Sequence, residues 1–230
     1  MKTKNIFIHL ILSSLLLFSG CAGMKNSTKG GFIGGASGAA VGAGIGALAG
    51  RGKGAAIGAA VGTVVGATTG TVIGKKMDAQ QAELEKIEGA KVESVTDVNN
   101  LQAIKVTFDS GILFETGKSE LNTQSRNALL NFANSLKNTP ETDVAVYGHT
   151  DNTGSRQLNE RLSLERAQAV VKFLTQNGIP DNRLIATGMA FDQPVADNST
   201  TEGRSQNRRV EIFITANETM IKEAEAGTLK

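Results

Sequence analysis

Two side chains of opposite charge, Asp151 and Arg166, are the first candidates for chemistry in this sequence. Asp151 lies in the turn 148–154, five residues before a predicted helix that begins at Arg156. Arg166 lies about 15 Å along that helix at about 1.5 Å per residue, and five extended loop residues reach about 17 Å. The two charges can therefore share one site, which would suit a zwitterion, with the carboxylate binding an ammonium and the guanidinium binding a carboxylate. The alternative is a structural salt bridge between them.

The predicted helix from Arg156 to Asn177 places Arg166 in an unusual position. Residues of its apolar arc, about 120° wide at about 100° per residue, are Leu158, Leu162, Ala169, Val170 and Phe173. Its solvent-facing residues are Glu160, Arg161, Glu165, Gln168 and Lys172. Arg166 falls inside the apolar arc, beside Asn159 and Ser163. A buried guanidinium without a partner costs several kcal/mol, so we expect Arg166 to bind an anion or to lie at the edge of a pocket.

Other chemistries find little support, and we predict a protein that is not an enzyme and holds no metal or cofactor. His149 would be the only histidine left once residues 1–20 are removed, which excludes a His-rich metal site. The chain has neither a nucleophile elbow nor a phosphate-binding loop. Lys and Arg number 24 against 22 Asp and Glu, and subtracting Lys2 and Lys4 makes the counts equal at 22. A neutral chain does not favour nucleic acid as a partner.

The elements that would hold this site alternate from about Leu101 onward. Apolar residues alternate at 104–108, 144–146 and 210–214, and a short apolar run occupies 184–187, which predicts four strands. Helices are predicted at Thr123–Lys137, before Pro140, and at Arg156–Asn177, before Gly178. The order β-α-β-α-β-β predicts an α+β fold with helices packed on a mixed sheet.

Several motifs in this region resemble the signature of the OmpA-like, peptidoglycan-binding domain family. They are Phe114-Glu115-Thr116-Gly117 with Leu121, Gly148-His149-Thr150-Asp151 with Gly154, Asn159, Leu162-Ser163 and Arg166-Ala167, and the run 203–210. The resemblance covers about residues 101–216. It implies a specific ligand, the diaminopimelate of the peptidoglycan stem peptide, whose side-chain end is a zwitterion.

The same resemblance implies roles for individual residues of this chain. Asp151 would bind the ligand's ammonium and Arg166 its carboxylate. Thr150, Asn152 and Asn159 would shape the loop and add hydrogen bonds, and Arg208 would line the pocket. The family often has Asp where this chain has Glu115, which leaves the role of Glu115 open. For Arg204 and Arg209, a structural role in the terminal loop and a binding role stay open.

The N-terminus has the pattern of an export signal, with positive charge at Met1 to Lys4 and an apolar stretch from Ile6 to Phe18. Ser19 and Gly20 precede Cys21, the only cysteine of the chain, and this resembles a bacterial lipoprotein cleavage box. We therefore expect Cys21 to be acylated and to anchor the protein in lipid. Ala22 after the cysteine resembles the sorting pattern for the outer membrane, which would place the C-terminal domain in the periplasm.

Twelve glycines recur at a period of four from Gly30 to Gly74. On a helix this spacing forms a groove in which two backbones approach closely. Arg51-Gly52-Lys53 divides the segment into halves of about 20 residues, which match a hydrocarbon core of about 30 Å. Three interpretations stay open: a membrane-inserted helical hairpin, a packed glycine zipper that forms homo-oligomers, and a mobile tether.

These patterns predict six segments: a lipoprotein signal peptide at 1–20, a lipid-anchored tether at 21–29, the glycine zipper at 30–74, a linker at 75–100, the OmpA-like domain at 101–217 and a polar tail at 218–230. The function predicted is an outer-membrane lipoprotein that binds the peptidoglycan stem peptide and tethers the outer membrane to the cell wall. The alternative is a scaffold or assembly factor that oligomerises through the zipper and uses wall binding only as an anchor.

Overall fold

The computed structural model describes residues 66–115 and 117–229 of the 230-residue chain. The predicted signal peptide, Cys21 and the glycines from Gly30 to Gly62 lie outside these residues. The strands are β1 (Ala90–Thr96), β2 (Gln102–Asp109), β3 (Thr142–Gly148), β4 (Leu184–Gly188) and β5 (Arg209–Ala216). The helices are α3 (Ala67–Leu84), α4 (Ser110–Leu113), α5 (Thr123–Asn138), α6 (Arg156–Gln176), α7 (Thr201–Asn207) and α8 (Glu218–Glu225), with a short 3₁₀ turn η2 (Asp181–Arg183).

The five strands form one mixed sheet in the order β1-β2-β5-β3-β4. Strands β3 and β4 are parallel and the other neighbouring pairs are antiparallel. From β2 onward the order of the main elements is β-α-β-α-β-β, which confirms the predicted α+β fold with helices packed on a mixed sheet. The four predicted strands and two predicted helices all form, with bounds that differ by only a few residues.

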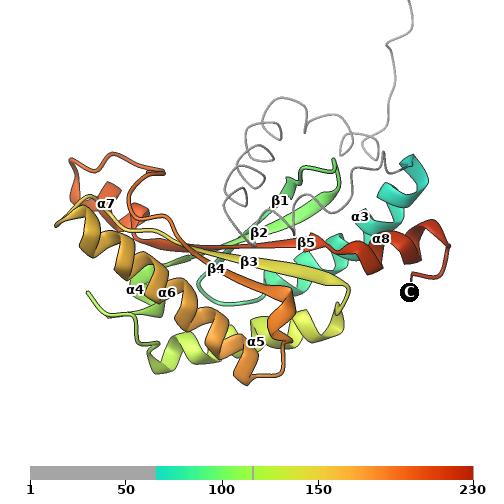
Figure 1. Cartoon of the computed structure of the whole chain (residues 1–230), viewed down its shortest axis with the longest axis horizontal. Helices are drawn as coiled ribbons and strands as arrows, with labels where there is room; N and C mark the ends of the chain where they lie inside the picture. Colours follow the sequence, from blue (N-terminus) through green and yellow to red (C-terminus); the bar gives the residue numbers. More distant parts are fainter. Residues whose placement is uncertain (1–65, 116, 230) are drawn as a thin grey trace, which may run out of the picture. The chain divides into compact units, whose positions relative to one another are not determined.

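Three long helices cover one face of this sheet (Figure 1). Helix α3 packs on β1 and β2, α6 packs on β3 and β4, and α5 lies between α3 and α6. The apolar residues that alternate along the strands point into the core formed here, as Val106, Val146 and Ile212 show, each with 0% of its surface exposed. On the other face, Tyr147 and Phe213 pack edge to face with their ring centroids 5.6 Å apart.

Two predicted boundaries need correction. Residues 75–100 are not a linker, because most of α3 and the whole of β1 lie within them, and β1 pairs with β2 from Ala90↔Phe108 to Thr96↔Gln102. Residues 218–230 are not only a polar tail, because α8 buries Met220, Ile221 and Ala224 in the core. The folded unit therefore extends beyond both ends of the predicted domain at 101–217.

The last turns of the predicted glycine zipper belong to this folded unit. Gly70 and Gly74 lie on α3, where a methyl group added to Gly74 would come within 3.2 Å of the Gln102 side chain. Between the glycines, Thr69 and Ile73 are buried. No helix within residues 66–115 and 117–229 combines the length and the apolar character needed to cross a bilayer. Residues 30–65 of the predicted hairpin at 30–74 lie outside the described residues, and the hairpin stays a prediction.

Candidate ligand-binding site

The site is built where the loop after β3 meets the first half of α6. Ser155 begins the helix, since its hydroxyl accepts a hydrogen bond from the Leu158 amide. Gly178 follows the C-terminal end of α6 with φ +89°, as its predicted role after the last turn requires. Close packing beneath the site depends on Gly148, because a Cβ there would lie 2.0 Å from the Ser163 carbonyl oxygen. The absence of a side chain at Gly148 thus lets α6 cross the end of β3.

Arg166 is buried, with only 2% of its surface exposed, as the sequence pattern predicted. Its Nε donates a hydrogen bond to the Lys118 carbonyl (3.0 Å) and its Nη1 donates a long one to the Ser110 hydroxyl (3.4 Å). The guanidinium lies over the Phe114 ring, with Cζ 5.3 Å from the centroid. Within residues 66–115 and 117–229, no carboxylate forms a salt bridge with it. Its charge is therefore oriented by neutral groups and available to an anion.

Asp151 has a different partner from the one expected. Its Oδ2 accepts a 2.6 Å hydrogen bond from Nη1 of Arg208, and its Oδ1 accepts one from the Thr153 amide at 2.8 Å. Burial alone would raise the pKa of Asp151, but the hydrogen bonds from Arg208 and Thr153 outweigh it and hold that pKa below its usual value. The structural salt bridge considered for Asp151 and Arg166 is thus formed by Asp151 and Arg208 instead.

Asp151 and Arg208 nevertheless lie near enough to Arg166 to change its electrostatics. Burial lowers the pKa of Arg166, Arg208 lowers it further by repulsion, and Asp151 raises it. The three side chains carry two positive charges and one negative charge. A carboxylate placed beside the two guanidinium groups would therefore relieve their mutual repulsion.

The remaining predicted residues divide into buried and exposed ones. Asn159 is 3% exposed, and its Nδ2 donates to the Thr153 carbonyl at 2.9 Å, which ties the loop to α6. Thr150 is 4% exposed; its amide donates to the Ala190 carbonyl, while its buried hydroxyl has no hydrogen-bond partner within the part of the chain that the structure describes. Asn152 is exposed at the tip of the loop.

Arg204, Arg209 and Glu115 are the three residues whose roles the sequence left open. Arg204 donates to the carbonyls of Asn198 and Ser199, and buried Arg209 bonds Glu211 and the Gln193 carbonyl. These contacts favour the structural role for both arginines. Glu115 is exposed and pairs with Lys118.

Sequence reasoning missed several residues that orient the charges. Ser110, Phe114 and the Lys118 carbonyl hold Arg166, although they precede it by about 50 residues in the chain. Phe114 belongs to a motif that the resemblance had singled out, but no pattern in the sequence pairs its ring with Arg166. Leu158 was wrongly placed in the apolar arc, since it is 44% exposed. The buried residues of α6 are Asn159, Ser163, Arg166, Ala167, Val170 and Leu174.

Comparisons with known proteins identify two families in this chain. The OmpA family matches residues 113–208, and the YMGG-like Gly-zipper family matches residues 1–78. The outer-membrane lipoprotein YfiB of Pseudomonas aeruginosa is 39% identical over 109 residues, which are 47% of this chain and 65% of YfiB. The peptidoglycan-binding protein ArfA of Mycobacterium bovis is 36% identical over 112 residues, 49% of this chain and 34% of ArfA. The chain thus spans less than two thirds of either relative.

The fold of this domain is similar to that of a solved structure. The cell wall anchor of the T6SS from Pseudomonas aeruginosa superposes with a TM-score of 0.52 at 30% identity, covering 61% of this chain and 97% of that one. The family match begins at the end of α4 and ends at Arg208, so it contains Arg166, Asp151 and every other predicted ligand-binding residue. This chain therefore carries an OmpA-family domain at residues 113–208, preceded at residues 1–78 by a YMGG-like glycine zipper.

Proposed function

We propose that this chain is an outer-membrane lipoprotein whose OmpA-family domain binds peptidoglycan without catalysis and tethers the outer membrane to the cell wall. The observation that carries the proposal is Arg166, a guanidinium with 2% of its surface exposed and no carboxylate in a salt bridge with it among the described residues. Burying such a charge is costly unless a ligand or partner offsets the cost. The site therefore fits a ligand that brings its own negative charge.

The ligand that we propose is the zwitterionic end of diaminopimelate in the peptidoglycan stem peptide. Its carboxylate would bind beside Arg166 and Arg208, and its ammonium would bind Asp151, whose lowered pKa keeps it ionised at neutral pH. Planar guanidinium groups suit a carboxylate because they offer two parallel N–H donors. Thr150 supplies a buried hydroxyl that is free to pair with the ligand, and Asn152 lies at the exposed tip of the same loop.

A binding role agrees with the position of the one histidine near the site. His149 is 1% exposed beneath the loop, and burial, with the neighbouring charge of Arg209, lowers its pKa to about 4. A general base must reach the substrate and titrate near the working pH. His149 meets neither condition, which supports a tether over a hydrolase.

The similar proteins support the proposed ligand and location. ArfA is named as a peptidoglycan-binding protein, YfiB as an outer-membrane lipoprotein, and the structurally similar T6SS protein as a cell wall anchor. Acylation of Cys21 would supply the membrane end of the tether, and Asp151 with Arg166 would supply the wall end.

The test compares two stem peptides that differ only at the third residue, diaminopimelate in one and lysine in the other. Binding of each to the full chain is measured by titration calorimetry. The diaminopimelate peptide should bind at least tenfold more tightly, because lysine has the ammonium but lacks the side-chain carboxylate for Arg166. Equal affinity for both peptides would refute the assignment of Arg166 to that carboxylate. In a separate experiment the full chain is incubated with purified sacculi, and release of fragments would refute the non-catalytic role.

A further inference from the structure

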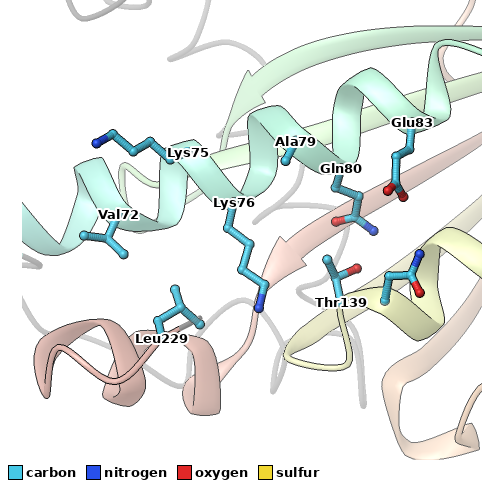
Figure 2. A pocket seen from close by; sticks show the side chains of 9 residues that line it. Val72, Lys75, Lys76, Ala79, Gln80, Glu83, Thr139 and Leu229 are labelled. Carbon is cyan, nitrogen blue, oxygen red and sulfur yellow. The ribbon is translucent and has the colours of Figure 1, made fainter.

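A cavity lies near the start of β3, at the end of that strand opposite to Asp151. It has a volume of about 420 Å³, within the range of about 300–1,000 Å³ that is typical of ligand pockets. Its walls are α3, the C-terminal end of α5 at Asn138 and Thr139, and Leu229 after α8 (Figure 2). Strand β3 starts at Thr142, three residues after Thr139 of this cavity, and ends at Gly148, where the turn 148–154 with Asp151 begins. The two sites are therefore separated by the length of the strand.

Gln80 is the most unusual residue of this cavity. It is 2% exposed, and neither its side-chain oxygen nor its side-chain nitrogen has a hydrogen-bond partner within residues 66–115 and 117–229. Figure 2 shows its amide directed from α3 toward the end of α5. The Thr139 carbonyl at that end of α5 already accepts hydrogen bonds from Arg183 and from the Thr142 hydroxyl. Leaving a buried amide unpaired destabilises the folded state, yet Gln80 keeps its amide at this position, where no other described residue bonds it.

Charges of opposite sign line the cavity along α3. Lys75 and Lys76 lie at the middle of α3, and Glu83 lies near its C-terminal end (Figure 2). Eight helical residues separate Lys75 from Glu83, or about 12 Å along the axis. Lys76 also forms an ion pair with Glu141 at 3.2 Å. Val72, Ala79 and Leu229 give the remainder of the wall an apolar character.

We propose that this cavity is a second binding site, which takes an extended peptide segment of about four residues. A strand rises about 3.3 Å per residue, so four extended residues span the distance along α3 between Lys75 and Glu83. A carboxyl terminus would lie near Lys75 and a basic residue near Glu83, while the backbone passes Gln80. The side-chain amide of Gln80 would then accept from one peptide N–H and donate to one peptide carbonyl.

The requirement for both a donor and an acceptor selects among ligand classes. Phosphate groups and carboxylates offer only acceptors, which would leave the Gln80 oxygen unpaired. Extended peptide backbone offers N–H and C=O groups side by side. Turning the Gln80 amide toward the cavity breaks no side-chain hydrogen bond within the described residues. The site does not depend on Asp151 or Arg166, so a peptide could be held there while the domain is bound to the wall.

The probe for this proposal is a synthetic tetrapeptide with an N-terminal lysine, three alanines and a free carboxyl terminus. It is titrated into the full chain carrying Arg166→Ala, so that the zwitterionic probe cannot use the first site. Side-chain amide resonances of Gln80, identified by their loss in Gln80→Leu, should shift and saturate. A probe with an amidated carboxyl terminus should bind more weakly, because it lacks the charge that Lys75 would attract.

Two variants of the same background decide the outcome. Gln80→Leu should weaken peptide binding roughly tenfold or more while its melting temperature stays equal to or above that of the parent, since it removes an unpaired buried amide. The control Gln81→Leu changes a neighbouring glutamine that bonds Glu85 outside the cavity, and it should bind as the parent does. Resonances that do not saturate, or unchanged affinity in Gln80→Leu, would overturn the peptide site without affecting the wall-binding proposal.

Discussion

Arg208 donates a 2.6 Å hydrogen bond to the carboxylate of Asp151, a residue 57 positions earlier in the chain. The bond joins the start of β5 to the loop after β3, which are neighbours because these two strands pair antiparallel up to Gly148↔Val210. It keeps Asp151 ionised and in place at the edge of the site where Arg166 is buried. The site therefore combines one acid with two guanidinium groups from different elements.

Replacing Arg208 by glutamine should raise the pKa of Asp151, because its hydrogen bond and charge favour the ionised carboxylate. In the unaltered protein the lowered pKa contributes stability above the unfolded value of 3.8, and this is lost as the pH falls through the folded-state pKa. Carbon NMR titration of the Asp151 carboxyl group measures the change. Arg204 contacts residues 198–201 and not Asp151, so the control Arg204→Gln should leave the pKa of Asp151 unaltered. An unchanged pKa in Arg208→Gln would contradict this account.

Arg166→Lys should weaken pull-down by purified sacculi at least tenfold while the protein still unfolds cooperatively. A lysine ammonium cannot bond the Lys118 carbonyl and also present two parallel donors to a ligand carboxylate. The same substitution at Arg161, which is 70% exposed on the outer side of α6, serves as the control and should bind normally. Pull-down equal to that of the unaltered chain would show that the guanidinium fork is not needed.

His149 should make the folded state sensitive to mild acid. Its pKa of about 4 lies below the ordinary 6.5, since burial and Arg209 oppose protonation while Glu211 favours it. The unfolded chain binds this proton near pH 6.5 and the folded chain only near pH 4. The free energy of unfolding should therefore fall by about 2–3 kcal/mol as the pH drops across that window.

Denaturant unfolding at a series of pH values measures this dependence. His149→Gln should make the free energy of unfolding nearly independent of pH between pH 6.5 and 4.5. This window lies above the pKa values of ordinary carboxylates. If the free energy of unfolding of His149→Gln still falls with pH as steeply as that of the parent, another group causes the pH dependence.

Gly148→Ala should destabilise the domain by about 2 kcal/mol or more, because a methyl group there meets the Ser163 carbonyl at 2.0 Å and α6 must move away. Gly111→Ala is the matched control, since nothing lies within 4 Å of the added carbon. Thermal and urea unfolding of both variants test the prediction. Equal stability of Gly148→Ala and the parent would mean that α6 tolerates the shift.

Local sequence patterns determined most of the secondary structure of this domain. Period-two alternation along β2, β3 and β5 identified buried strands, because one face of each strand meets the helices. Helical periodicity placed Arg166 among apolar residues, and the structure confirms its burial. The same periodicity misplaced Leu158, since near the N-terminal end of α6 the buried side holds Asn159 and Ser163 against loop and strand ends.

Other elements had no local signal strong enough to reveal them. Strand β1 is an edge strand of half-buried and exposed residues, so its pattern resembled a linker until β2 paired with it. Helix α8 is short and rich in charge, and only three of its residues reach the core. These elements form because the rest of the domain offers them a surface, which is tertiary information.

The contacts of the charged residues in the site also divide into those that the sequence predicts and those that only the folded chain shows. The residue types and the turn at 148–154 by themselves predicted that Asp151 and Arg166 can share one site or form a salt bridge. Only the folded chain could show that Arg208 bonds Asp151 and that Ser110, Phe114 and Lys118 orient Arg166. A side chain's spacing along its own helix or strand is a local property that sequence determines, whereas contacts between residues about 50 positions apart depend on how β2, α6 and β5 pack together.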